Sequence, residues 1–364
     1  MVRFRMLSID GGGIRGLIPA MILERLEAET GKTIPELFDV VAGTSTGGIL
    51  ALALSLRDEK QPDRPKFRAG DIVKLYKEEG SKIFAKSKFW ATLDALVGGL
   101  PGVSEIGHRL GLPRDADVHD LFSPKYGEKG RRDVLRARFG DALLKDALTR
   151  VFITSYETEQ RIPVFFVSRA SDELDEEYGE AICGEVSMLD AALATSAAPT
   201  YFPPHQVAMP HRPYSLVDGG VFANNPTGLA RTFMRGKSSD SDFIVSLGTG
   251  SMQVPYPFDE IKGWGAIRWA SPILKMTFDG QTEAVALGLR HVVERNGYFR
   301  IQGLLGKGHV ADDMDDATPE NIQRMEELAG TLIDSTDFRA VCQLLRSESG
   351  ARADDREAAT VSPA

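Results

Sequence analysis

"VVAGTSTGGIL", residues 40–50, places a Gly-x-Ser-x-Gly pattern between an apolar strand and an apolar helix. This is the context of a nucleophile elbow, in which a sharp strand-to-helix turn projects the hydroxyl of Ser45 outward. Gly43 and Gly47 carry no side chains that would clash in so tight a turn, and the N-terminus of the following helix favours negative charge near the reacting oxygen. The stretch predicts an α/β fold with a nucleophilic serine, and a purely structural tight turn is the alternative.

A second glycine-rich turn, "LSIDGGGIRG" (residues 7–16), also joins a predicted strand to a predicted helix. Its G-x-G-x-x-G pattern matches the dinucleotide-binding fingerprint, for which Glu27 or Glu29 has the spacing of the ribose-binding acid. The same glycines could instead hold backbone N–H groups around a developing oxyanion, because consecutive N–H groups at a helix N-terminus form an anion-binding nest. The dinucleotide interpretation leaves Ser45 without a task, so we favour the oxyanion.

A carboxylate suited to act as the base for this serine precedes a third glycine-rich turn. "YSLVDGGVFANNP" (residues 214–226) ends a predicted strand at Asp218 and turns on Gly219 and Gly220. Parallel α/β sheets place their sites at the carboxyl edge of the strands, so this carboxylate would point across that edge toward Ser45. A turn aspartate that caps its own backbone is the alternative.

The six histidines supply a competing base, since histidine is the habitual partner of a serine nucleophile. An ordinary α/β-hydrolase would use Ser45, Asp218 and either His291 or His309, in that chain order. Such a fold places several strands before its elbow, whereas only 44 residues precede Ser45 here. No histidine lies in a glycine-rich strand-end motif, and His205 lies in a proline-rich loop that we expect at the surface.

In this order, "DGGGIRG", "GTSTGG" and "DGG" resemble the three signatures of the patatin-like phospholipases, a family of lipid acyl hydrolases with a Ser–Asp dyad. "ATSAAPTYFPP" (residues 194–204) is also similar to a segment of that family, and the resemblance covers about residues 3–250. It implies a three-layer α/β/α fold with a mostly parallel central sheet, with Ser45 as nucleophile and Asp218 as general base. It also implies an oxyanion hole made by the backbone of Gly11, Gly12 and Gly13. Arg15 would steady this loop or add positive charge beside the oxyanion, and a solvated arginine is the alternative.

The resemblance also indicates the substrate and its surroundings. It implies a glycerophospholipid or another acyl lipid as substrate, with no metal ion and no cofactor. Residues 82–103 combine lysines with aromatic side chains, which suits contact with a membrane surface, although a core helix with a solvated lysine face gives the same pattern. A catalytically idle lipid-binding protein is a further alternative.

Regulation by a nucleotide is a second implication. Some bacterial patatin-like enzymes of about this size are antiphage effectors that cyclic nucleotides switch on. This chain is similar to them in scale and in "FGDALLKDALTRVFITSYE" (residues 139–157). A cyclic-nucleotide activator is therefore an expectation of the resemblance, although no residue pattern identifies a nucleotide site.

Composition indicates one soluble domain. The net charge of −9 offers no basic face for a nucleic-acid polymer. We expect a cytoplasmic protein with peripheral membrane contact, because no run of about 18 apolar residues is present, and we expect Cys183 and Cys342 to be reduced. Strands alternate with helices in the catalytic region at residues 3–250; residues 251–345 are mostly helical and extend the same domain, and residues 346–364 are predicted to be disordered.

Overall fold

The computed structural model describes most of the chain. The described residues are 3–83, 127–169, 180–210, 212–235, 241–252, 255–294, 297–305, 310–311 and 313–347. Most of the segment 82–103 and nearly all of the predicted disordered tail lie outside these ranges. The predictions for those two segments therefore stay predictions.

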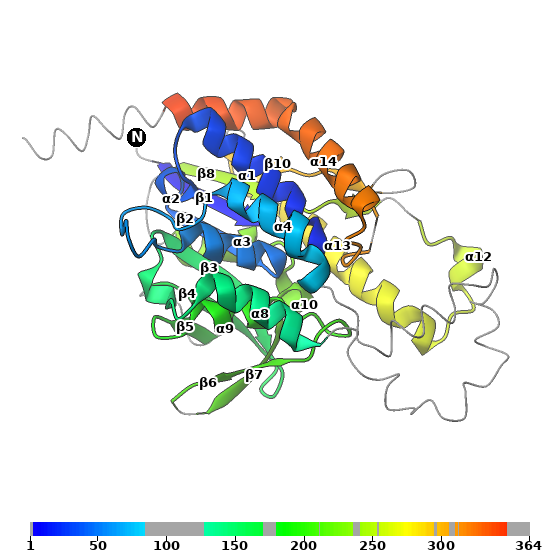
Figure 1. Cartoon of the computed structure of the whole chain (residues 1–364). Coiled ribbons are helices and arrows are strands. Elements are labelled where there is room, and N and C mark those ends of the chain that lie inside the picture. Colours follow the sequence, from blue (N-terminus) through cyan, green and yellow to red (C-terminus); the bar gives the residue numbers. More distant parts are fainter. Residues whose placement is uncertain are drawn as a thin grey trace, which may run out of the picture.

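One sheet organises the fold, with the strand order β10-β8-β1-β2-β3-β4-β5 (Figure 1). The strands β10, β8, β1, β2 and β3 run parallel, whereas β4 is antiparallel to β3 and β5 is parallel to β4. The strands β6 and β7 form an antiparallel pair that joins the sheet through β3. The strand bounds are β1 (Arg3–Ile9), β2 (Val40–Thr44), β3 (Arg150–Glu157), β4 (Ile162–Val167), β5 (Glu180–Cys183), β6 (His205–Ala208), β7 (Pro213–Asp218), β8 (Ser241–Leu247) and β10 (Tyr298–Ile301), and a separate small pair joins β9 (Ser251–Met252) to β11 (Leu304–Leu305).

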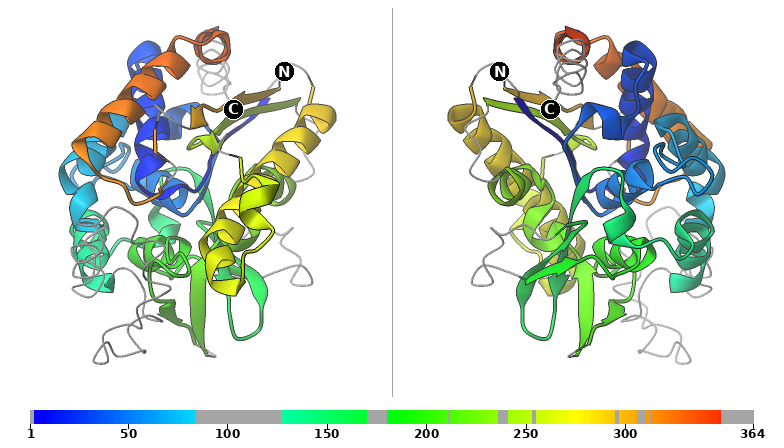
Figure 2. Two further views of the ribbon diagram at one scale, coloured as in Figure 1. Left: turned by 90° about the vertical axis from the view of Figure 1, so that its right-hand side faces the viewer. Right: turned by 90° about the vertical axis from the view of Figure 1, so that its left-hand side faces the viewer.

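Helices cover both faces of this sheet, as the edge-on views of Figure 2 show for α1 and α14 on one side and α13 on the other. The first side holds α1 (Leu17–Thr30), α2 (Ile34–Leu37), α3 (Thr46–Ser55), α4 (Ala69–Ile83), α8 (Glu128–Phe139), α9 (Met188–Thr195) and α14 (Pro319–Ile333). The second holds α10 (Gly220–Ala223), α11 (Thr227–Met234) and α13 (Ala266–Val292), while α12 (Phe258–Ile261) lies away from the sheet in Figure 1.

The alternation of side chains along β1 shows why both faces need cover. Leu7 and Ile9 point into the core under α1 and α3, whereas Phe4 and Met6 point into the core under α11 and α13. A strand that is apolar on both faces is buried only when helices lie above and below it. The predicted three-layer α/β/α fold with a mostly parallel sheet is confirmed.

The elements expected in the first half agree with the structure. The helix predicted after the glycine loop is α1, and Gly31 at its C-terminal end adopts the left-handed conformation of a helix C-cap (φ 71°). The C-terminal part is mostly helical, with α13, α14 and a further helix at residues 336–347. The strand that ends at Asp218 differs from the expectation of a parallel neighbour, because β7 runs antiparallel to β3.

Candidate active site

Two strands meet end to end beside β3, and this meeting assembles the site. The last residue of β2, Thr44, pairs with Thr154 of β3, while Asp218 at the end of β7 pairs with the next β3 residue, Ser155. The two strands approach from opposite directions, so their carboxyl ends face each other. Ser45 follows directly after β2 and is thereby placed beside Asp218. The carboxylate therefore reaches the serine through an antiparallel strand, and not across the edge of a purely parallel sheet.

Ser45 has the backbone conformation expected of a nucleophile elbow. Its φ of 55° and ψ of −123° are unfavourable for a residue with a side chain, and such strain is held only where the surroundings fix it. A Cβ at Gly43 would collide with the carbonyl of Gly47, and one at Gly47 would collide with the carbonyl of Ile9. The N–H of Ser45 donates to Oγ1 of Thr195 at 2.9 Å. These contacts hold the turn, and they leave the Ser45 side chain half-buried at the pocket wall.

Asp218 is buried, lines the same pocket as Ser45, and accepts a hydrogen bond from the Gly220 N–H at 2.7 Å. Burial raises the pKa of Asp218 to about 6, while the neighbouring Ser45 hydroxyl, the Gly220 N–H and the charge of Arg131 lower it. The carboxylate is therefore largely ionised at neutral pH and suited to accept a proton. Gly219 packs so closely against Thr154 that no side chain would fit there.

The glycine loop places its three N–H groups differently. The Gly11 N–H donates to the carbonyl of Asn224 at 3.1 Å and is thus used within the fold. Gly12 and Gly13 line the pocket together with Ser45, and within the described residues neither of their N–H groups has a partner. The candidate oxyanion donors are therefore Gly12 and Gly13, whereas Gly11 anchors the loop.

Arg15 holds the glycine loop from inside the protein. Its side chain is buried, and its Nε donates to the carbonyl of Gly12 at 3.3 Å. The solvated alternative is therefore wrong. The C-terminal part also contributes, because the N–H of Ile14 donates to the carbonyl of Met314 at 2.8 Å.

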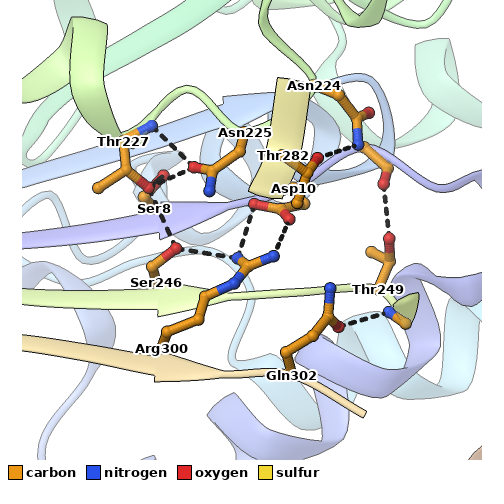
Figure 3. Close-up of polar contacts among 12 residues, drawn as sticks. Ser8, Asp10, Asn224, Asn225, Thr227, Ser246, Thr249, Thr282, Arg300 and Gln302 are labelled. Atoms are coloured by element: carbon orange, nitrogen blue, oxygen red, sulfur yellow. Dashed lines mark hydrogen bonds and ion pairs between the residues drawn. The ribbon is translucent and has the colours of Figure 1, made fainter. Parts of the chain in front are cut away.

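A buried ion pair supports the same loop from beneath (Figure 3). Arg300 of β10 contacts Asp10, the residue before the three glycines, through two bonds: Nη1 to Oδ1 at 3.0 Å and Nη2 to Oδ2 at 2.5 Å. Both side chains are at least 95% buried. Nη1 also donates to Ser246 at 2.9 Å, and Oγ1 of Thr249 donates to the carbonyl of Gly11 at 2.6 Å. Sequence analysis missed this support, which comes from residues far along the chain.

The pocket beside Ser45 is mainly apolar. Its apolar lining comes from α3, α4, α8, the segment after α9, α13 and the segment before α14: Ile49, Leu75, Ile83, Leu135, Ala198, Phe202, Phe278 and Met314. A pocket of this kind suits a hydrocarbon chain. Sequence analysis did not single out these residues, nor Arg131, which lines the same pocket.

The described histidines are separate from this pocket. His205 begins β6, is buried, and pairs its Nε2 with Oδ1 of Asp190 at 2.9 Å, so the expectation of a surface loop is wrong for this residue. His291 is exposed near the C-terminal end of α13, and neither residue lines the pocket with Ser45. His309 lies outside the described residues.

Three further observations concern ligands and location. Within the described residues, no group of three or more His, Cys, Asp and Glu side chains is placed to hold a metal ion. None of the described helices combines the length and apolar character that a membrane span requires. Cys342 is a free, buried thiol whose pKa is raised to about 11 by burial, whereas the side chain of Cys183 lies outside the description.

Comparison with known proteins shows which family the chain is similar to. Residues 7–231 match the family model described as patatin-like phospholipase. The chain is 32% identical to Patatin-like protein 2 of Arabidopsis thaliana over 90% of its own length and 82% of that protein. It is 30% identical to Patatin-T5 of Solanum tuberosum over 90% and 83% of the two chains. Among solved structures, human GIVD cytosolic phospholipase A2 matches with a TM-score of 0.45 and 13% identity, over 95% of this chain and 60% of that one.

The chain belongs to the patatin-like phospholipase family. It is accordingly a hydrolase that acts on ester bonds, of the lipid acyl hydrolase class. This membership favours the oxyanion interpretation of the glycine loop over the dinucleotide interpretation.

Proposed function

We propose that this protein cleaves the acyl ester bonds of membrane glycerophospholipids through a Ser45–Asp218 dyad, without a histidine. The observation that carries the proposal is the placement of Ser45 beside the buried carboxyl of Asp218, where β2 and β7 end face to face. A general base must lie within hydrogen-bond reach of the proton it removes, and Asp218 is the carboxylate that shares the pocket with Ser45. We place the reaction at the cytoplasmic surface of a membrane, where such lipids are present.

The first half-reaction forms an acyl-enzyme. Asp218 accepts the hydroxyl proton while Oγ of Ser45 attacks the ester carbonyl carbon, and the negative charge that develops on the carbonyl oxygen is stabilised by the N–H groups of Gly12 and Gly13. The tetrahedral intermediate then breaks its bond to the alcohol oxygen. That oxygen takes the proton from Asp218 and leaves as the lysolipid.

The second half-reaction releases the fatty acid. Asp218, ionised again, removes a proton from water as the water oxygen attacks the acyl carbonyl. The second tetrahedral intermediate breaks the bond to Oγ of Ser45, which regains its proton from Asp218. The mostly apolar pocket holds the acyl chain through both steps.

A fluorophosphonate probe and lipid hydrolysis test the dyad together. We expect Ser45→Ala to abolish both labelling and hydrolysis, and Asp218→Asn to lower turnover by about two or more orders of magnitude, the usual scale for the loss of a general base. His291→Ala is the matched control, because His291 is exposed and lies outside the pocket, and it should retain wild-type rates.

Two results would contradict the dyad. Undiminished turnover in Ser45→Ala protein would remove Ser45 as the nucleophile. A folded His291→Ala or His309→Ala variant as inactive as Asp218→Asn would replace the dyad with an ordinary Ser–His–Asp triad. Circular dichroism spectra of every variant establish that the folds are comparable.

Activation by a cyclic nucleotide, which the sequence resemblance implies, is tested in the same assay. Lipid hydrolysis by the wild-type protein is measured with and without a panel of cyclic nucleotides. A rise in kcat with one of them supports this regulation, and equal rates with all of them contradict it.

A further inference from the structure

Arg131 brings a buried positive charge to the wall of the active-site pocket. It lies in the first turns of α8, is 1% exposed, and lines the same pocket as Ser45 and Asp218. A buried guanidinium is unfavourable unless negative or polar groups compensate it. The hydrogen-bond partners of its three nitrogens therefore show how far the protein itself compensates this charge.

The partners of Arg131 satisfy only one of its three nitrogens. Nη1 donates to the carbonyl oxygen of Ser196 and, at 3.2 Å, to the hydroxyl of the same residue. The guanidinium also lies over the ring of Phe202, with its central carbon 4.1 Å from the ring centroid. Nε and Nη2 are buried and have no hydrogen-bond partner. The charges of Glu128 and Asp218 act on Arg131, but neither carboxylate is bonded to it.

The two unpartnered nitrogens form one functional edge. In an arginine side chain the N–H bonds of Nε and Nη2 point in the same direction, which is the side-on arrangement that binds two oxygens of one anion. Unsatisfied buried donors are uncommon in folded proteins and call for an explanation. Burial lowers the pKa of Arg131 to about 10, so the group is still a cation at neutral pH. The geometry of this edge fits an anion that offers two oxygens side by side.

We propose that Arg131 binds the phosphate group of the lipid substrate through Nε and Nη2, so that the pocket selects phosphodiester-bearing lipids over neutral acyl esters. This inference rests on the proposed function, because it places the substrate ester at Ser45. Two phosphate oxygens match the planar fork of an arginine, and a lysine would match them less well. The apolar side of the pocket then holds the acyl chain while Arg131 fixes the polar side of the same molecule.

Arg131 has a second effect besides binding phosphate, because it changes the pKa of Asp218. The charge of Arg131 lowers the pKa of Asp218, so a substitution also changes the base. That change would slow the hydrolysis of every ester alike, whereas loss of a phosphate contact slows only substrates that carry phosphate. The ratio of two substrates therefore distinguishes the two roles.

The test compares two substrates with the same acyl chains, dihexanoylphosphatidylcholine and 1,2-dihexanoylglycerol, at concentrations where both are monomeric. We expect Arg131→Gln to lower the ratio of their kcat/KM values by about tenfold or more, the usual effect of losing a hydrogen-bonded charge contact. Arg131→Lys keeps the charge and loses the fork, so its ratio should fall between wild type and Arg131→Gln. Arg136→Gln, on the exposed side of α8, is the matched control and should keep the wild-type ratio.

An unchanged ratio in folded Arg131→Gln protein would overturn the proposal, since both substrates would then depend equally on this residue. If that variant does not fold, the ratio in Arg131→Lys decides in the same way. A third arm adds inorganic phosphate to the neutral-ester assay. Inhibition of wild type that is lost in Arg131→Gln, together with an unchanged lipid ratio, would assign the edge to free phosphate and overturn the lipid assignment. If wild type hydrolyses neither substrate, or if Ser45→Ala hydrolyses both, the proposed function itself fails.

Discussion

Two buried arginines lie near the catalytic residues: Arg300 contacts the start of the glycine loop, and Arg131 lines the pocket. The two differ in the groups that surround the guanidinium. Arg300 is paired through both Nη atoms with the carboxylate of Asp10 and is also bonded to Ser246. Arg131 has a carbonyl, a hydroxyl and an aromatic ring as its neighbours, and two of its nitrogens have no partner. The protein pairs the first charge directly, whereas Glu128 and Asp218 offset the second only through their charge, and two of its nitrogens stay open to a ligand.

The comparison separates the fixed part of the site from the part that meets substrate. Around Arg300, hydroxyls such as those of Ser8 and Thr227 continue the network at 2.8 Å, and Figure 3 shows these groups directed toward one another. Nδ2 of Asn225 has no partner in this network, but its other hydrogen bonds restrain the side chains that they join. Rigidity is what an oxyanion hole requires, because its donors must already lie in place when charge develops.

Of the substitutions at these two arginines, removal of Arg300 should therefore cause the largest loss of stability and of kcat. Arg300→Met leaves the carboxylate of Asp10 buried without a counter-charge, which costs about 3–5 kcal/mol of unfolding free energy when one partner of a buried pair is lost. The glycine loop would lose its support, so kcat should also fall, by about 100-fold, the scale for loss of an oxyanion donor. Urea denaturation and steady-state kinetics measure both. Arg290→Met, at an exposed position of α13, is the control, and wild-type kcat in folded Arg300→Met protein would contradict the role.

The ion pair between Asp10 and Arg300 should also produce a measurable coupling in stability, smaller than the loss expected for Arg300→Met. Asp10→Asn alone leaves the arginine uncompensated, whereas Asp10→Asn combined with Arg300→Met removes both charges. We expect the double variant to lose less unfolding free energy than the two single variants lose together, and this difference, the coupling energy, should be about 1–3 kcal/mol. A double-mutant cycle by urea denaturation measures this quantity. Additive losses would show that the two side chains contribute separately.

How much of this site could be predicted from sequence depends on how local its signals are. Ser45 and Asp218 each lie at a strand end in a short glycine-rich motif, so the residue types within a few positions identify them. The same holds for the strand–turn–helix order that predicts the fold. The antiparallel approach of β7 could not be predicted, because its direction is set by pairing with Ser155 and its neighbours in β3.

The two arginines show where sequence reasoning ends. Arg300 is 290 positions from Asp10, and no local pattern joins them. Arg131 lies in "EKGRRDVLRARF", where neighbouring arginines look alike and only packing decides which one enters the pocket. The Gly11 N–H also resembles those of the next two glycines in sequence, although it alone contacts the carbonyl of Asn224.

A smaller effect concerns the pH dependence of hydrolysis, which a change at Arg131 should shift and a change at Arg300 should not. Asp218 must be ionised to accept the proton, so kcat/KM should fall as the pH drops below its pKa of about 6. Arg131 lowers this pKa, so Arg131→Gln should move the acid limb of the profile to higher pH. Arg300 is not among the groups that set the pKa of Asp218, so folded Arg300→Lys protein should keep the limb in place. An unshifted limb in Arg131→Gln would contradict this coupling.

The smallest effect should be the change in stability when Arg131 itself becomes apolar. Arg131→Met loses the contacts to Ser196 and the ring of Phe202, but it also removes a buried charge that the protein does not pair. Replacement of a buried charge that forms no ion pair by an apolar side chain of similar volume is often neutral or stabilising, so we expect a change within about 1 kcal/mol. The midpoint and slope of urea denaturation measure it, with Arg136→Met as the control on the exposed side of the same helix. A loss as large as that expected for Arg300→Met would make Arg131 a structural residue, and the contrast between a self-compensated and a ligand-compensated arginine would be wrong.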